Sequence, residues 1–432
     1  MSVSFDIIPI VKNDYGCRVV ANARLLYARL AVSTTVEMVV ARLVLDALGV
    51  KGYGLFAAAS GGLAALFFFN GALEAAARRF VCYDKANFAP LLGLTLTLSA
   101  CVGLLGVVLS VFFFAPSLSL LFPLLGVLVL NVLRLPYEAC VVAGERMGFF
   151  LGLSLAESAL SLLSALAIPL FPFCPLTTYA TLRLVSAVLA SAIVLAYCRR
   201  HYAESRARPV FRFSKIKTLL GFFTWHALGS VAGLLKGSGI VLLLATYAGT
   251  SGCAAYEAAA KITILLWGLI ANYRMAYLPG IVKAWADGKK DSFVLCAARA
   301  FRFSAVGMTI LSVPIVILAP QICRVWLGAD MPPMSDMFMR MFVLQFFFEA
   351  LATPLDTAVL ATGRIARYEI MLTIVIGTSF VFAWTFLLLG LPAWTATGAV
   401  ALANVFACLY RFVYLKVFHR IAIRAWFVRC DA

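Results

Sequence analysis

Ten basic residues lie inside stretches that are otherwise almost wholly apolar, and these residues are the best placed to do chemistry. They are Arg29, Arg42, Arg134, Arg183, Lys236, Lys261, Arg274, Arg302, Arg340 and Arg411. A cation at the centre of a lipid-facing helix costs about 2.5–3.5 kcal/mol, so each should face protein or a wet cavity. Cations held in this way suit an anionic ligand such as a phosphate or diphosphate.

Lys236 is the strongest candidate for a substrate-binding residue. It lies near the middle of an apolar stretch, too deep to reach water easily, and no acid lies within one helical turn of it. Gly233, Gly237 and Gly239 flank it, and such glycines let neighbouring backbone approach and let a helix bend. The alternative is that Lys236 pairs with a distant acid such as Glu349 and only fixes the packing.

Four further cations are predicted to line the same cavity. Arg29 and Arg42 lie on the expected first helix, and Lys261 lies on the expected eighth, where a cleft between two halves is expected. Arg274 is the fourth, although Arg274, like Arg302 and Arg411, lies close enough to a helix end to extend its side chain to water.

The acids inside apolar stretches are fewer. The candidates for coupling transport to an ion are Glu349, Glu37, Glu257 and Asp356. A desolvated carboxylate that faces a cavity can take up a proton, although each of these could equally be the partner of a buried cation. Arg134 lies four residues before Glu138, which predicts a structural ion pair on one helix face.

No pattern points to covalent chemistry. The sequence has no G-x-x-x-x-G-K-[ST] phosphate-binding loop, and its three histidines lack a second ligand at metal spacing. The eleven cysteines are scattered singly, which argues against disulfides and zinc. We therefore expect a transporter without a cofactor or resident metal, in which a proton or sodium ion is the coupling ion if there is one.

The elements that carry these residues are membrane-spanning helices. Of the 432 residues 63% are hydrophobic and 13% charged, which predicts an all-α polytopic membrane protein of about twelve helices. The expected helices are residues 20–47, 53–77, 88–114, 119–143, 149–171, 177–198, 219–247, 253–278, 296–318, 336–361, 367–390 and 393–416.

The domain organisation follows from the polar stretches. We expect a cytoplasmic segment (1–19) without signal-peptide character, an N-terminal lobe of helices 1–6 (20–198) and a basic linker (199–218). A C-terminal lobe of helices 7–12 (219–417) and a cytoplasmic basic tail (418–432) follow. At an offset of 200 residues, Gly49, Gly52, Ala58 and Ala59 match Gly249, Gly252, Ala258 and Ala259. This match predicts two lobes related by a pseudo-two-fold axis along the membrane normal.

Orientation follows from the 36 lysines and arginines. With both termini in the cytoplasm, 24 fall on the cytoplasmic side, 2 (Lys51 and Arg324) on exterior loops and 10 within spans. The net charge of +17 therefore reflects topology, and the scattered short loops argue against a nucleic-acid partner.

Several stretches, in this order and spacing, resemble one transporter family over residues 22–411. They include Asn22–Arg29, Arg42–Gly54, Asn70–Ala72, Pro136-Tyr137, Gly144–Met147, Trp225 with Gly229 to Ile240, Trp326–Gly328, Pro354-Leu355 and Ala361–Tyr368. The chain is similar to the repeat-unit flippases of bacterial O-antigen, capsule and exopolysaccharide synthesis. These belong to the multidrug/oligosaccharidyl-lipid/polysaccharide exporter superfamily.

This resemblance implies alternating access in the bacterial inner membrane. The substrate would be an oligosaccharide linked to undecaprenyl pyrophosphate, moved from the cytoplasmic to the periplasmic leaflet. Membrane lipids and the polysaccharide polymerase machinery would be partners. Two alternatives stay open: a multidrug and toxin extrusion antiporter, expected to have an acidic cavity, and a lipid II flippase, a family that typically carries two more helices.

Overall fold

The computed structural model describes residues 14–83, 88–113, 118–144, 146–211, 227, 230–362 and 366–419. In these ranges all regular structure is helical, as predicted. Residues 1–13 and 420–432 of the predicted end segments, and residues 212–218 of the predicted linker, lie outside the described residues, whereas 14–19 are helical.

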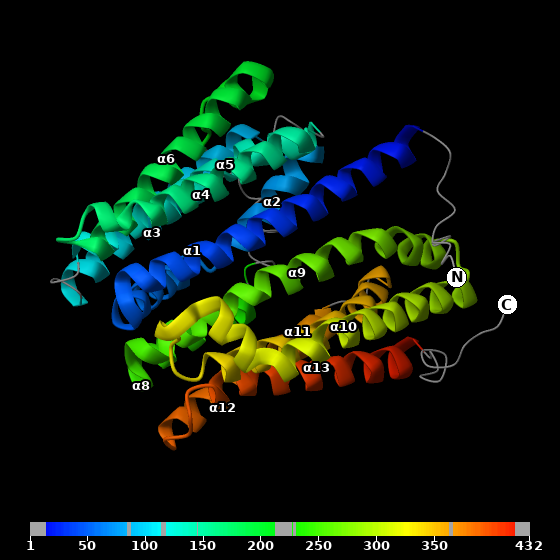
Figure 1. Ribbon diagram of the computed structural model, residues 1–432. Coiled ribbons are helices and arrows are strands. Elements are labelled where there is room, and N and C mark those ends of the chain that lie inside the picture. Colours follow the sequence, from blue (N-terminus) through cyan, green and yellow to red (C-terminus); the bar gives the residue numbers. More distant parts are fainter. Residues whose placement is uncertain are drawn as a thin grey trace, which may run out of the picture.

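The first six predicted helices form one group (Figure 1). This N-terminal lobe contains α1 (Asp14–Leu66), α2 (Asn70–Tyr83), α3 (Phe88–Phe113), α4 (Leu118–Ala143), α5 (Met147–Leu166) and α6 (Pro175–His201). Short 3₁₀ turns, η3 (Ile168–Leu170) and η4 (Ala203–Arg206), follow α5 and α6. The predicted helix 149–171 therefore ends early, and Pro169 in η3 has no N–H with which to continue an α-helix.

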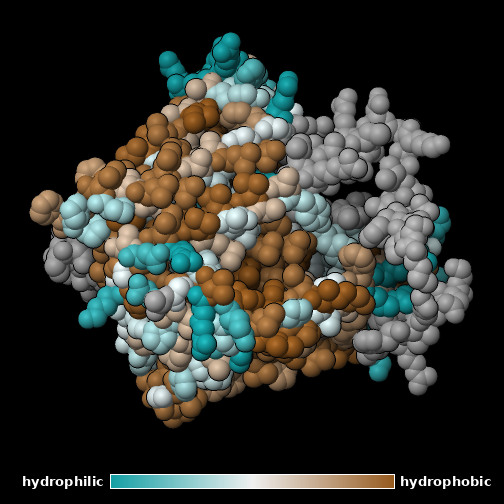
Figure 2. All heavy atoms as spheres, in the orientation of Figure 1, coloured by the Kyte–Doolittle hydropathy of each residue, from teal (hydrophilic) through white to brown (hydrophobic). Residues whose placement is uncertain are grey.

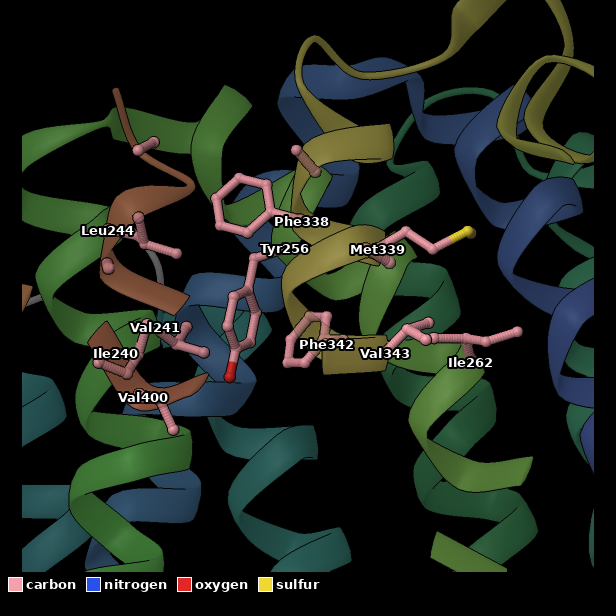
Figure 3. Close-up of a cluster of buried hydrophobic side chains, with 14 of the residues drawn as sticks. Ile240, Val241, Leu244, Tyr256, Ile262, Phe338, Met339, Phe342, Val343 and Val400 are labelled. Carbon is pink, nitrogen blue, oxygen red and sulfur yellow. The ribbon is translucent and has the colours of Figure 1, made fainter. Parts of the chain in front are cut away.

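The remaining helices form the C-terminal lobe. They are the π-helical turn η5 (Leu235–Gly239), α8 (Ile240–Tyr247), α9 (Gly249–Ala286), α10 (Lys290–Leu327), α11 (Ser335–Ala361), α12 (Ala366–Leu388) and α13 (Thr395–His419). The core of this lobe includes Tyr256 of α9, packed edge-on against Phe338 and Phe342 of α11 (Figure 3).

Glycines at equivalent positions join the first two helices of each lobe. The two parts of α1, which correspond to the first two predicted helices, meet at Gly49, and α8 is followed by Gly249 at the start of α9. Both glycines have φ of +65°, a conformation that residues with a Cβ rarely adopt. The same backbone feature thus recurs at the offset that the sequence match predicts.

Several further helices differ from the predicted bounds, among them α9, which ends at Ala286 rather than near 278. The predicted helix 53–77 is broken at residues 67–69, where α1 and α2 meet at an angle of 55° because Phe67 and Phe69 turn into the lobe's core. Helix α10 continues well beyond 296–318, to Lys290 at one end and Leu327 at the other. Charged residues end an apolar run without ending a helix.

The helices have the length and composition of membrane spans. Ten helices among the described residues are long and apolar enough to cross a membrane, or eleven with the bent pair of α1 and α2. Most of the surface in Figure 2 is apolar, with hydrophilic side chains in separate small groups. The first turn of α1 and the last turn of α13 lie at the same end of the molecule (Figure 1).

The lobes meet through α1. In the described part of the chain, the extensive contacts between the lobes join α1 to α9, and smaller ones join it to η5, α8 and α10. A buried cluster combines Val44 and Leu45 of α1 with Ala254 and Ala258 of α9 and Leu327 of α10. In the described residues, helix α1 therefore supplies most of the N-terminal lobe's side of the boundary between the lobes.

Candidate functional site

The predicted cavity residues fall into separate charged groups rather than around one cavity. One group lies inside the N-terminal lobe, one at the lobe boundary and one inside the C-terminal lobe. None of the cavities described below is lined by more than one of Arg29, Arg42, Lys236 and Lys261, so the single cavity that they would share stays a prediction. Spacing along the sequence does not show on which side of a helix each residue's partners lie.

The N-terminal group surrounds a cavity of about 230 Å³ between α1, α4, α5 and α6. Its polar lining is Arg29, Ser33, Glu37, Asn131, Arg134, Ser154, Glu157, Ser158, Arg183 and Ser186. The lining combines hydroxyl, amide, guanidinium and carboxylate groups, all of which are able to form hydrogen bonds. The cavity can hold a polar, uncharged or anionic group.

Arg134 is the most tightly held cation of this cavity. Its Nε lies 2.8 Å from Glu138 Oε1, the pair expected from sequence, and its Nη1 donates to Glu157 on α5. The partner Glu157 was not singled out, because the two residues are adjacent only after α4 and α5 pack together. Arg134 thus ties two helices together in addition to facing the cavity.

The other two arginines keep weaker contacts. The Arg29 guanidinium lies 4.6 Å from the centre of the Phe150 ring, a cation–π contact. Arg183 Nη1 donates to Ser161 Oγ at 2.7 Å. Arg183 was an intramembrane cation without an assigned role, and the structure places it in the cavity with Arg29.

The second group joins the two lobes. Lys261 Nζ on α9 lies 2.8 Å from Glu257 Oε1 on the same helix and 3.9 Å from Glu37 Oε2 on α1. Glu37 also lines the N-terminal cavity. This one carboxylate therefore connects the cavity of one lobe with a cation of the other.

The third group includes Lys236, which has an acid partner after all. Its Nζ lies 3.3 Å from both carboxylate oxygens of Glu349 on α11. Lys236 lies in the π-helical turn η5, and π-turns within α-helices frequently mark functional sites. Added Cβ atoms at Gly233 and Gly237 would meet no atom within 4 Å, so space is open beside this turn.

Beside this pair lies a cavity of about 250 Å³ between α9, α11 and α13. It is lined by Trp267, Ile270, Ala271, Arg274, Glu349, Ala352, Thr353, Asp356 and Arg411. Asp356 Oδ2 lies 3.6 Å from Arg274 Nη2, and its Oδ1 lies 3.7 Å from Arg411 Nε. The Tyr368 hydroxyl donates to Asp356 and accepts from Arg411 Nε.

Arg411 therefore does not extend to water. Its side chain is 12% exposed and bonded to Tyr368, so the alternative that it snorkels is wrong. Arg274 lines a cavity inside the C-terminal lobe, beside Asp356 rather than beside Lys261. Arg411 and Tyr368 were missed as site residues because α12 and α13 bring them to Asp356 from the far end of the chain.

Arg42 lies outside all three groups. Its side chain is half exposed, lies 3.7 Å from Asp46 and donates to the backbone oxygen of Val325 on α10. Beside it, Trp326 Nε1 donates to Met38 O at 2.9 Å. Arg42 thus joins the lobes at the predicted exterior end, where the apolar cluster of the lobe boundary also lies.

Solved structures share this two-lobed fold. The lipid II flippase MurJ in an inward-closed conformation aligns with a TM-score of 0.69 at 13% identity, over 93% of this chain and 89% of that one. A MOP superfamily transporter from Pyrococcus furiosus, described by the reversed polarity of its binding pocket, aligns with a TM-score of 0.61 at 16% identity, over 96% of each chain.

A multidrug resistance transporter of the MATE family in an inward-facing conformation aligns with a TM-score of 0.62 at 15% identity, over 93% of this chain and 96% of that one. A scan of protein-family models found no match, and neither did a search among curated proteins. The chain therefore has the fold of the MOP superfamily transporters, as a multi-pass membrane protein. At these identities, the likeness shows the fold alone.

Proposed function

We propose that this chain is a flippase that moves an undecaprenyl-pyrophosphate-linked oligosaccharide across the bacterial inner membrane by alternating access. The observation that carries the proposal is the charged cavity of the C-terminal lobe. Within ion-pair distance there, three cations (Lys236, Arg274 and Arg411) share two carboxylates (Glu349 and Asp356). All three pairs measure 3.3–3.7 Å, longer than the roughly 2.7–2.9 Å of a strong charge-assisted bond.

Long pairs around a cavity can be exchanged for a better partner. A diphosphate that enters exchanges water for several charge-assisted hydrogen bonds, each worth about 1.5–3 kcal/mol. The serines and Asn131 of the N-terminal cavity supply groups that pair with sugar hydroxyls. In this proposal the diphosphate binds the C-terminal lobe, the sugars face the N-terminal cavity, and the lipid tail stays in the bilayer.

Two alternative functions can be compared with this proposal. A cation-exporting antiporter needs carboxylates that can bind a cationic substrate, whereas each of the four coupling candidates here forms an ion pair with Lys236, Lys261, Arg274 or Arg411. A lipid II-type flippase is favoured by the MurJ likeness. The substrate of such a flippase differs from the proposed lipid-linked oligosaccharide in its sugar unit. A lipid II-type flippase is therefore the second candidate function.

The test is flipping in liposomes that contain the purified protein. A lipid-linked diphosphate oligosaccharide with a fluorophore on its sugar is reconstituted, and dithionite in the medium reports the fraction in the outer leaflet. We expect transport by the wild type, loss in Lys236→Ala and partial retention in Lys236→Arg. Lys289→Ala is the control, since Lys289 is 67% exposed and pairs only with Asp287 among described residues.

A stably inserted Lys236→Ala protein that flips the lipid at the wild-type rate would refute this site. Faster flipping of lipid II than of the oligosaccharide would favour the second candidate. Efflux of a cationic dye without lipid flipping would favour the antiporter.

A further inference from the structure

The carboxylate of Glu349 occupies the position that an anionic ligand of Lys236 would take. Both of its oxygens lie 3.3 Å from the Lys236 ammonium, in the two-point arrangement that a phosphate oxygen pair would adopt. It lies on the wall of the 250 Å³ cavity, while its backbone oxygen is anchored by Thr353 Oγ1 at 2.7 Å. A ligand that reaches Lys236 from this cavity therefore meets Glu349 first.

The charged neighbours of this pair come from four elements. Arg274 belongs to α9, Asp356 to α11, Glu369 to α12 and Arg411 to α13, and all but Glu369 line the cavity beside Glu349. Glu369 on α12 acts electrostatically on Asp356 and Arg411. Because Asp356 already has both arginines and the Tyr368 hydroxyl as partners, Glu349 depends on Lys236 for its counter-charge.

The backbone around Lys236 leaves room for an exchange of partners. The π-helical turn is wider than an α-helical one, and Gly233 and Gly237 on either side face open space. The Lys236 side chain is 25% exposed and that of Glu349 is 19% exposed, so water reaches both. The pair is accessible enough to open, and at these exposures a charge without a partner would keep only part of its hydration.

We infer that Glu349 is a built-in competitor of the anionic substrate, and that the substrate's arrival at Lys236 is linked to the uptake of one proton by Glu349. The inference rests on the proposed function, in which the diphosphate binds Lys236. The incoming anion takes the ammonium, and the displaced carboxylate binds a proton from water to become a neutral carboxylic acid. On release of the anion the acid gives up this proton and the Lys236–Glu349 pair forms again.

Thermodynamic linkage gives the inference a distinctive signature. If one proton is bound with each anion, affinity rises about tenfold for each unit by which the pH falls while Glu349 is ionised. Removing the competitor has the opposite effect from removing a binding residue. Glu349→Gln should therefore bind the anion more tightly, by about tenfold, and without this dependence on pH.

The experiment measures binding of a short-chain prenyl diphosphate sugar to the purified full-length protein by calorimetry at about pH 6 and about pH 8. This probe is a diphosphate diester, so it does not itself titrate in that range. We expect wild-type affinity to rise at the lower pH, Glu349→Gln to bind tightly at both, and Lys236→Met to bind at neither. Asp287→Asn, which removes the acid of the surface Lys289 pair outside the three charged groups, should keep the wild-type pH dependence.

The outcomes separate this inference from the proposed function. A wild type that does not bind the probe would overturn both. Binding that is lost in Lys236→Met but is equal or weaker in Glu349→Gln, or is the same at both pH values in the wild type, would overturn the inference alone. Such an outcome is expected if the Lys236–Glu349 pair only fixes the packing of the helices. Misfolding cannot imitate the expected result, because a misfolded variant does not gain affinity.

Discussion

At the scale of single residues, the intramembrane charges differ in how firmly they are held. Arg134 bonds two carboxylates in the interior of the N-terminal lobe, and its side chain is 18% exposed. The Arg42–Asp46 pair is about half exposed on both sides. The cost of losing an ion pair depends on whether the charge left behind can reach water.

This difference predicts unequal losses of stability. Arg134→Leu leaves Glu138 and Glu157 close together without their shared cation, and should lower the free energy of unfolding by about 3–5 kcal/mol. Arg42→Leu breaks an exposed pair and should cost no more than about 1 kcal/mol. Thermal unfolding of both variants in detergent checks this. Equal midpoints would show that water reaches the Glu138 and Glu157 carboxylates freely.

At the scale of elements, close backbone contact between α1 and α9 joins the lobes near the predicted exterior end. A Cβ added at Gly54 would lie 1.8 Å from the backbone oxygen of Thr250, a distance that no side-chain adjustment can relieve. Glycine at this position lets the two helices approach, and the approach buries the apolar residues of the lobe boundary.

Gly54→Ala should therefore separate α1 from α9, lowering the unfolding midpoint and changing transport. The matched control is Gly71→Ala in α2, where the new methyl group meets no atom within 4 Å and should stabilise the helix by up to about 1 kcal/mol. Thermal unfolding and the liposome assay measure both variants. If Gly54→Ala unfolded at or above the wild-type midpoint, the tight contact would be absent from the protein in the membrane.

At the scale of the whole molecule, the arrangement of helices predicts which loops share a face of the membrane. Cys174 precedes α6 and Arg208 follows it, so the two lie at opposite ends of a 27-residue helix, about 40 Å long. The excess of positive charge assigns the Arg208 end to the cytoplasm. Both assignments remain predictions.

Cysteine labelling in intact cells tests this orientation. A variant that retains only Cys174 should react with an impermeant maleimide from outside, because the residue is exposed and lies on the predicted exterior face. A variant with Arg208→Cys as its only cysteine should react only after lysis. Labelling of the Arg208→Cys protein from outside would reverse the topology.

Much of the fold follows from local composition. Apolar runs long enough to span a bilayer predicted the helices, since backbone groups in lipid must bond within their own segment. The match between Gly49 and Gly249 pointed to a turn that the structure repeats. The intramembrane charges could be recognised from sequence because a charge inside an apolar span is costly. The Arg134–Glu138 pair could be predicted because the two residues lie one helical turn apart.

Tertiary structure decided which charges from distant parts of the chain meet. Glu349 lies 113 residues from Lys236, and Asp356 gains Arg274, Arg411 and Tyr368 from three different helices. Partner choice depends on how each helix is rotated and which neighbours it packs against, and the apolar residues that set this rotation are interchangeable in sequence. The sequence therefore predicted one wet cavity. In the described residues, helix packing forms two charged cavities, one in each lobe, and a charged group at the boundary between the lobes.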